Sequence, residues 1–135
     1  ACTMNSILKQ FIKHLTVEEN EVVLLDMEAG VEHFGRGVDN SVDLILMIVD
    51  PSFESLKLTK KIQQLGESIG KTVFFVLNKV NGQILPTMLE SIDDQSKVLA
   101  VISEDTEIAR KGLLGNELMM EIPEIHTLAR KILKQ

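Results

Sequence analysis

Four short apolar runs, separated by segments of helical periodicity, constrain the fold of this 135-residue chain more than any other feature. Each run is rich in Val, Ile, Leu and Phe and does not alternate strictly with polar residues, which is typical of strands covered on both faces. The runs are Val22 to Leu25, Leu44 to Val49, Val73 to Leu77 and Val98 to Ile102. This order predicts a single α/β domain over residues 1–135, with an open, mostly parallel sheet of about four strands covered by helices.

Helix start and stop signals surround these runs. The longest predicted helix begins after Pro51 with Ser52 as its N-cap, and it stops at Gly70. The other predicted helices are Met4 to Leu15, Ile84 to Ile92, Asp105 to about Leu114 and Pro123 to Leu133. Strands and helices therefore alternate, as a parallel sheet requires.

Charge and hydropathy exclude several classes of partner. A net charge of -6 opposes binding to nucleic acid or to anionic lipid, because both are negatively charged. The longest apolar stretch, Leu44 to Val49, is far shorter than the roughly 20 residues of a membrane helix, and no leader peptide is recognised. We therefore expect a cytoplasmic protein that binds neither nucleic acid nor membranes. Its one cysteine, Cys2, cannot form an internal disulfide.

Ligands of open parallel sheets bind beyond the carboxyl ends of the strands, so the residues that follow each run are the first place to look for a site. Asp26 follows the first run and Gly30 comes four residues later. An acid at this place can order the water shell of Mg²⁺, and a glycine lets a backbone N–H approach a terminal phosphate. A strand end followed by a turn would give the same pattern without function. The next loop, with His33, Arg36 and two glycines, suits a segment that changes conformation with the phosphate state.

Polar residues also follow the other runs. Asn78 follows the third run, and its carboxamide can pair with the edge of a purine, although Asn also favours turns for local reasons. Ser103 and Asp105 follow the fourth run, where a loop flanking the base would lie, but Asp105 also suits a helix cap. After the second run, Asp50 is followed by Pro51 and Ser52. The start of a helix explains this pattern more simply than a ligand site does.

Taken together, these residues resemble the MinD/ParA-type P-loop ATPases, and most closely the CooC family of nickel-insertion accessory ATPases of carbon monoxide dehydrogenase. Residues 22–37 are similar to the Walker B and switch II segment of that family, including its Glu-Ala-Gly-x-Glu-His-x-x-Arg pattern. Residues 50–52 and 76–80 fit the same family, and residues 98–112 are similar, with Ser103 where members commonly have proline. The resemblance covers essentially the whole chain, but only the C-terminal portion of such a P-loop NTPase fold.

The resemblance implies roles for individual residues. Asp26 would act through water on Mg²⁺, and the backbone of Gly30 would sense the γ-phosphate of ATP. Asn78 would recognise adenine, with Ser103 and Asp105 on the base side. The whole protein would be an ATPase that inserts nickel into carbon monoxide dehydrogenase, its client, and binds ATP or ADP with Mg²⁺.

The resemblance also gives Cys2 a possible partner across a homodimer. Family members carry a Cys-x-Cys pair before a helix like the one predicted at Met4 to Leu15, and two subunits can share one metal through these pairs. Thiolates suit Ni²⁺ or Zn²⁺. This sequence begins with Ala1 and Cys2, so the other cysteine of the pair is absent from it. A Cys2 that binds no metal is the alternative.

The phosphate-binding loop of the family is missing from this sequence. Such a loop is rich in glycine and ends in Gly-Lys-Ser or Gly-Lys-Thr, directly after a strand. Gly70 and Lys71 are followed by Thr72, but they precede a strand instead of following one. We therefore expect no appreciable ATP hydrolysis by this chain alone. Two other readings stay open: another MinD/ParA-type ATPase, such as an iron–sulfur reductase, and a non-enzymatic α/β module for protein–protein interaction.

In the resembled fold, the strand that leads into this loop lies between the strands ending at Asp26 and Val49. The resemblance therefore implies that a central strand is missing here, which would leave backbone N–H and C=O groups unpaired within an apolar sheet. Three arrangements would compensate: direct pairing of the two flanking strands, insertion of a strand from a second copy, or pairing with an N-terminal partner polypeptide.

Overall fold

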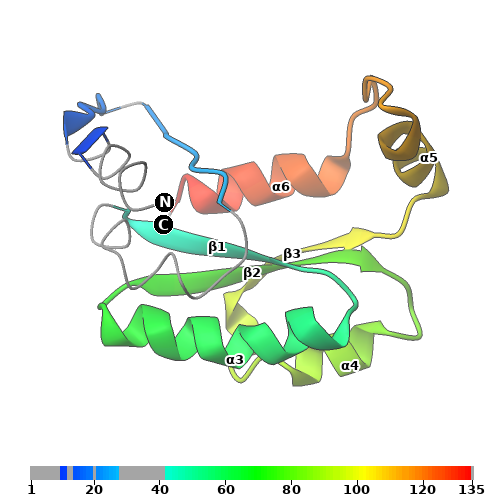
Figure 1. The fold of residues 1–135 in the computed structure, drawn as a ribbon, viewed down its shortest axis with the longest axis horizontal. Coiled ribbons are helices and arrows are strands. Elements are labelled where there is room, and N and C mark those ends of the chain that lie inside the picture. The colour runs from blue at the N-terminus through cyan, green and yellow to red at the C-terminus, as the bar shows by residue number, and fades with distance from the viewer. Residues whose placement is uncertain (1–9, 12–13, 20, 28–41, 135) are drawn as a thin grey trace.

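The structure, a computed structural model, describes residues 10–11, 14–19, 21–27 and 42–134. Within these residues the sheet has three parallel strands in sequence order, and the middle strand is the longest (Figure 1). The strands are β1 (Leu44–Val49), β2 (Thr72–Val80) and β3 (Val98–Ser103). This arrangement confirms the predicted α/β fold class with a parallel sheet.

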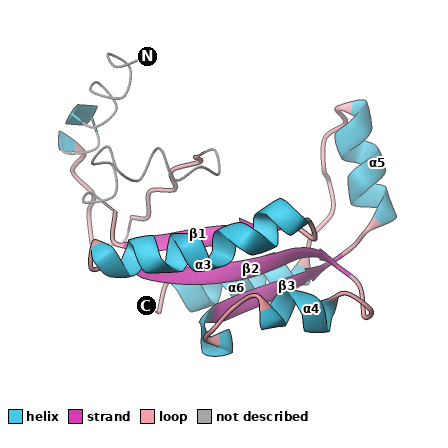
Figure 2. Ribbon diagram, turned by 60° about the horizontal axis from the view of Figure 1, so that its bottom comes forward, coloured by secondary structure: helices cyan, strands magenta, loops and turns pink. Residues whose placement is uncertain are grey.

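Helices cover both faces of the sheet, as Figures 1 and 2 show. Among the described residues, the helices with defined bounds are α3 (Phe53–Ser68), α4 (Leu85–Glu90), α5 (Thr106–Leu114) and α6 (Pro123–Ile132), with a short 3₁₀ turn, η2 (Gln95–Lys97), before β3. Helix α5 lies beyond the end of the sheet and covers neither face. Helices α3 and α4 lie on one face and α6 lies on the other. None of the helices in the described ranges is long and apolar enough to cross a bilayer.

Side chains of β2 alternate between two hydrophobic clusters because successive residues of a strand point to opposite faces. Phe75 and Leu77 are fully buried in the cluster beneath α3 and α4, together with Met88. Val76, also fully buried, points to the other face and packs with Leu128 of α6. A central strand buried on both sides explains why its sequence shows no polar alternation.

The predicted start and stop of the longest helix are confirmed. The Ser52 hydroxyl accepts a hydrogen bond from the backbone N–H of Ser55 at 3.2 Å, which satisfies a free N–H of the first turn. Past the other end, Gly70 has a φ of +68°, a conformation that glycine adopts without steric cost. Ser52 and Gly70 therefore bound α3 for the reasons that the sequence indicates.

The strand predicted at Val22 to Leu25 is wrong. Residues 21–27 have no regular structure, and Val22, Val23 and Leu24 are 56%, 46% and 82% exposed. An apolar run becomes a strand only where a neighbouring strand completes its backbone hydrogen bonds. Within the part of the chain that the structure describes, β1 pairs only with β2, so the flanking strands do not pair directly with each other.

Most of the helix predicted at Met4 to Leu15 lies outside the described residues. Within that range Gln10, Phe11 and His14 are helical. An imidazole nitrogen of His14, Nδ1, lies 2.8 Å from the carbonyl oxygen of Gln10, one helical turn earlier. These three described residues therefore agree with the predicted helix.

Candidate functional site

The carboxyl ends of the strands bring Asp50 and Asn78 together, although they are 28 positions apart in the sequence. Asp50 directly follows β1, and Asn78 lies near the end of the neighbouring β2. Asn78 Nδ2 donates a hydrogen bond to Asp50 Oδ1 at 2.9 Å, and Lys79 Nζ donates to Asp50 Oδ2 at 2.7 Å. Both oxygens of one carboxylate are thus used by two consecutive residues of β2. We call these three residues the Asp50 cluster.

A bulge in β2 makes this arrangement possible. Consecutive residues of a regular strand point to opposite faces, so Asn78 and Lys79 would not both reach one carboxylate. The pairing of β2 with β3 shifts register between Leu77 and Val80, and Lys79 has a φ of +55°. A left-handed conformation is uncommon for a residue with a side chain, and bulges of this kind re-aim side chains. The bulge therefore directs the neighbouring side chains of Asn78 and Lys79 to the same carboxylate.

The backbone around Asp50 is also fixed. Its N–H donates to the hydroxyl of Ser55 at 3.1 Å, and its carbonyl accepts from the N–H of Ser52 at 2.8 Å. Burial raises the pKa of Asp50. The hydrogen bond from Lys79, the hydrogen bond from Asn78 and the positive charge of Lys79 together outweigh burial, so the pKa lies below its ordinary value. Asp50 is therefore ionised at neutral pH and can only accept hydrogen bonds.

Sequence reasoning assigned Asp50 to a helix start and missed its contact with Asn78. A signal for the contact was present, because Asp50 directly follows a buried strand, and the carboxyl ends of parallel strands meet at one edge. The bulge could not be predicted from the sequence, because it depends on how β2 pairs with β3. Asn78 was therefore expected to point off the end of its strand, whereas it lies inside β2.

Ser103 and Asp105 lie beyond the same edge of the sheet. Ser103 ends β3 opposite Val80, and its side chain is exposed. Asp105 is the N-cap of α5: its Oδ1 accepts from the backbone N–H groups of Glu107 at 2.7 Å and Ile108 at 3.0 Å. The structure thus shows the capping role that the sequence allowed, and one oxygen of the carboxylate is used for it.

The predicted phosphate side of the site is described only in part. Gly30, His33 and Arg36 lie outside the described residues, as does Cys2. Asp26 is described, and its exposed side chain makes no hydrogen bond or ion pair with the other described residues. An exposed carboxylate is open to a hydrated Mg²⁺, but among the described residues no group of three or more His, Cys, Asp or Glu side chains is placed to hold a metal ion.

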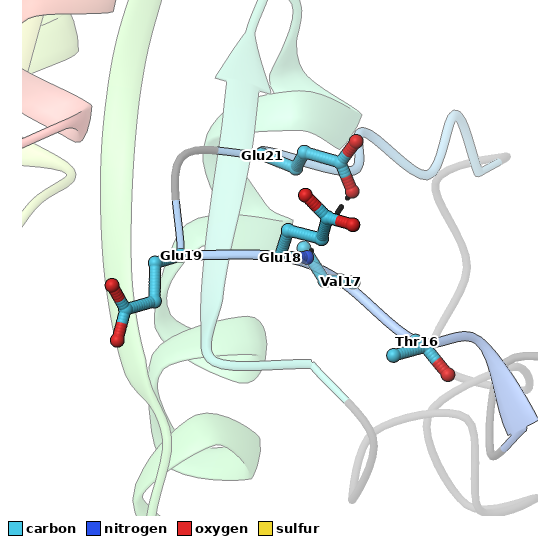
Figure 3. Close-up of a pocket in the computed structure, with 5 residues that line it drawn as sticks. All are labelled: Thr16, Val17, Glu18, Glu19 and Glu21. Carbon is cyan, nitrogen blue, oxygen red and sulfur yellow. Dashed lines mark hydrogen bonds between the residues drawn. The ribbon is translucent and has the colours of Figure 1, made fainter.

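A shallow hollow near the start of the described chain does not fit a phosphate ligand. It is lined by residues of one local turn: Thr16, Val17, Glu18, Glu19 and Glu21. Figure 3 shows the carboxylates of Glu18 and Glu21 side by side while that of Glu19 points away, and the N–H of Glu18 donates to Glu21 Oε2 at 3.1 Å. Three carboxylates repel anions, so this hollow is not part of the candidate site.

Comparison with known proteins identifies relatives along nearly the whole chain. The uncharacterized ATP-binding protein MJ0084 of Methanocaldococcus jannaschii is 44% identical over 134 residues, or 99% of this chain. A second ATP-binding protein of that organism, MJ0823, is 32% identical over 89% of the chain. The carbon monoxide dehydrogenase accessory protein CooC of Rhodospirillum rubrum is 32% identical over 84% of the chain. No family model matches the sequence.

The chain spans about half the length of these relatives: 53% of MJ0084, 48% of MJ0823 and 44% of CooC. The matches nevertheless cover the sequence stretches on which the resemblance to CooC was based, because each extends over more than four-fifths of this chain. The resemblance to CooC is thereby confirmed: the chain is similar to CooC and to these ATP-binding proteins over about half of their length.

Proposed function

We propose that this chain is the part of a MinD/ParA-type ATPase that carries the base-recognition side and the Walker B and switch II segment. Asn78 contacts the adenine of ATP from the carboxyl end of β2, with Ser103 and Asp105 beside it. The observation that carries the proposal is the Asp50 cluster, which holds a carboxamide at the sheet edge where ligands of parallel sheets bind. The ATP-binding relatives over nearly the whole chain support it.

On the phosphate side, Asp26 contacts the water shell of Mg²⁺ and the backbone of Gly30 contacts the γ-phosphate. The exposed carboxylate of Asp26 is compatible with this role. The sequence contains no loop that ends in Gly-Lys-Ser or Gly-Lys-Thr after a strand. Since backbone N–H groups and a lysine normally hold the phosphates, we expect this chain alone to bind ATP weakly and not to hydrolyse it.

The cellular role that fits best is delivery of nickel to carbon monoxide dehydrogenase by a cytoplasmic homodimer. The support is the match to CooC, whose name identifies it as an accessory protein of that enzyme. A metal shared between subunits, Ni²⁺ or Zn²⁺, would need Cys2 and further thiolates. This chain has one cysteine, so it does not by itself supply a complete metal site.

Calorimetric titration with ATP and Mg²⁺ tests the nucleotide site. Two proteins are compared: this chain and a longer polypeptide that contains it at the length of the relatives. We expect clear binding to the longer form and little to the short one, and we expect Asn78→Ala to weaken the binding. Asp26→Asn in the longer form should stop hydrolysis while ATP still binds, because Asp26 acts at the metal and not at the base. Tight binding by the short chain would refute the need for the missing loop.

A control separates a site effect from a general loss of charge. Asp93 forms an exposed ion pair with Lys60, at 3.6 Å, with both side chains 62% exposed. Asp93→Asn therefore makes the same chemical change as Asp26→Asn at a position with no proposed ligand. If both variants lost hydrolysis equally, Asp26 would have no special role.

A further inference from the structure

We propose that Asp50 is a positioning residue that fixes the orientation of the Asn78 carboxamide and thereby makes the site prefer adenine to guanine. The inference rests on the proposed function, because it concerns which base the same site accepts. It adds a residue that the sequence pattern assigned to a helix start.

The contact with Asp50 determines the orientation of the Asn78 carboxamide. The oxygen and nitrogen of an Asn side chain are nearly the same size, so the hydrogen-bond network determines which way the group faces. An ionised carboxylate offers no proton, and Asp50 is kept ionised by its lowered pKa. The NH₂ group of Asn78 must therefore face Asp50, as the 2.9 Å contact from Nδ2 to Oδ1 shows. Asn78 Oδ1 is turned away from Asp50, and it accepts no hydrogen bond from the described residues.

Neighbouring residues hold Asp50 itself in place. Lys79 occupies its other oxygen, Oδ2, and Ser55 holds its backbone N–H. Asn78 is only partly buried, so its carboxamide is within reach of a ligand at the carboxyl ends of the strands. One hydrogen of the Asn78 NH₂ group is used by Asp50, and the second hydrogen and the oxygen remain for a ligand.

A carboxamide held in this orientation matches adenine better than guanine. Adenine presents an amino donor beside the N7 acceptor, whereas guanine presents two acceptors, O6 and N7. A carboxamide of fixed orientation pairs its oxygen with the amino group of adenine and its remaining N–H with N7. Against guanine, the same oxygen faces O6, and two acceptors repel. A carboxamide that is free to rotate would lose this discrimination, because its NH₂ group could turn to either acceptor.

The affinities for ATP and for GTP are measured by calorimetry with Mg²⁺. The protein used is the longer polypeptide that contains this chain, for which we expect clear ATP binding. We expect Asp50→Ala to lower the ratio of ATP to GTP affinity by at least about five-fold, the lower end of what one bidentate base contact provides. Asp50→Asn keeps the size and an acceptor oxygen but no longer forces the orientation, so its ratio should lie between those of Asp50→Ala and the unmodified protein. This graded order would not arise from a fold defect alone. Circular dichroism checks that each variant is folded.

Two control variants separate the contacts of the cluster. Lys79→Met removes the ion pair that helps to hold Asp50 but leaves the contact between Asp50 and Asn78, so it should lower the base preference less than Asp50→Ala does. Asp93→Ala removes a carboxylate from an exposed ion pair elsewhere and should leave the preference unchanged. A loss of preference in Asp93→Ala equal to that in Asp50→Ala would overturn the inference.

The outcomes distinguish the inference from the proposed function. If Asn78→Ala weakens ATP binding while both Asp50 variants keep the full preference, Asp50 does not position Asn78 and the inference is wrong. If Asn78→Ala leaves ATP affinity unchanged, the proposed base contact is wrong. If neither the short nor the longer form binds ATP, the proposed function fails and this inference fails with it.

Discussion

The side-chain hydroxyl of Thr59, in the middle of α3, lies 2.7 Å from the carbonyl oxygen of Ser91, at the end of α4. The two residues are 32 positions apart, and Thr59 is completely buried. Oγ1 also lies 2.7 Å from the carbonyl oxygen of Leu56, so its one proton is offered to two acceptors. This hydroxyl links the two helices that cover the same face of the sheet.

Thr59→Val should therefore lower the free energy of unfolding by about 1–3 kcal/mol, the usual effect of leaving a buried polar group unsatisfied. Valine has nearly the same shape, so packing changes little and the lost hydrogen bond dominates. Thr59→Ser is the matched control: it keeps the hydroxyl and loses one methyl group, about 0.8 kcal/mol. Urea denaturation measures both. A Thr59→Val variant as stable as the unmodified chain would show that the link between the helices contributes nothing.

Gly66 allows α3 to approach the start of β2. A Cβ at this position would lie 2.4 Å from Val73 Cγ2 and 2.9 Å from the carbonyl oxygen of Lys71. The backbone oxygen cannot move without displacing the strand, so Gly66→Ala should destabilise the fold by roughly 1–3 kcal/mol. Thermal unfolding followed by circular dichroism measures the change.

Gly112 provides the control for this prediction, since it is also a helical glycine but has nothing within 4 Å of an added Cβ. Gly112→Ala should raise stability by about 0.5–1 kcal/mol, because alanine restricts the unfolded chain more than glycine does. Opposite signs for the two substitutions are expected. A gain at Gly66 similar to that at Gly112 would mean that α3 does not contact the sheet as closely as described.

The lowered pKa of Asp50 predicts how the stability of the chain changes in acid. Its ordinary value is 3.8, and burial raises it while Lys79 and Asn78 lower it by a larger amount. The folded state therefore binds this proton less readily than the unfolded chain does. The stability from Asp50 is fully present above pH 3.8 and is lost as the pH falls through the lower folded pKa.

Urea denaturation at a series of pH values between 7 and 2.5 tests the direction of this pH dependence. The unmodified chain should lose more stability below about pH 4 than Asp50→Asn, which has no proton to gain there. Asp93→Asn shows how much any surface carboxylate contributes to the same curve. A pH dependence in Asp50→Asn equal to that of the unmodified chain would contradict the proposed role of the Lys79 and Asn78 contacts in stability.

Elements defined by local chemistry could be predicted closely from the sequence. The strand at Leu44–Val49 was predicted at its observed bounds, and Ser52 and Asp105 cap α3 and α5. Apolar runs and capping side chains act over a few residues, so their signals lie in the local sequence. Asn78 lies near the carboxyl end of β2 because it follows a buried run, and its contact with a base stays a prediction.

Features that depend on pairing could not be predicted. The bulge at Asn78 and Lys79 arises from the register of β2 against β3, and it creates the contact to Asp50. The run from Val22 to Leu25 has the composition of a strand but lacks a neighbour in the described structure. Composition measures the tendency to form a strand, whereas the strand itself requires hydrogen bonds from another one.

Leu24 belongs to this run, and its side chain is 82% exposed. Leu24→Ala should change the stability of this chain by less than about 0.5 kcal/mol, as is usual for an exposed site. Leu99→Ala is the matched control, because Leu99 is 5% exposed and packs against α6. Its loss should be about 2–5 kcal/mol. Urea denaturation of both variants makes the comparison.

The same pair of substitutions in a longer polypeptide asks whether an added strand lies between the run and β1. If it does, Leu24 becomes buried, and Leu24→Ala should then destabilise that form by about 2–5 kcal/mol, like Leu99→Ala. If Leu24→Ala is neutral in both forms, the run from Val22 to Leu25 is not part of the sheet in either. If it already destabilises the short chain as much as Leu99→Ala does, the run is packed there too, and the exposure described for Leu24 does not hold in solution.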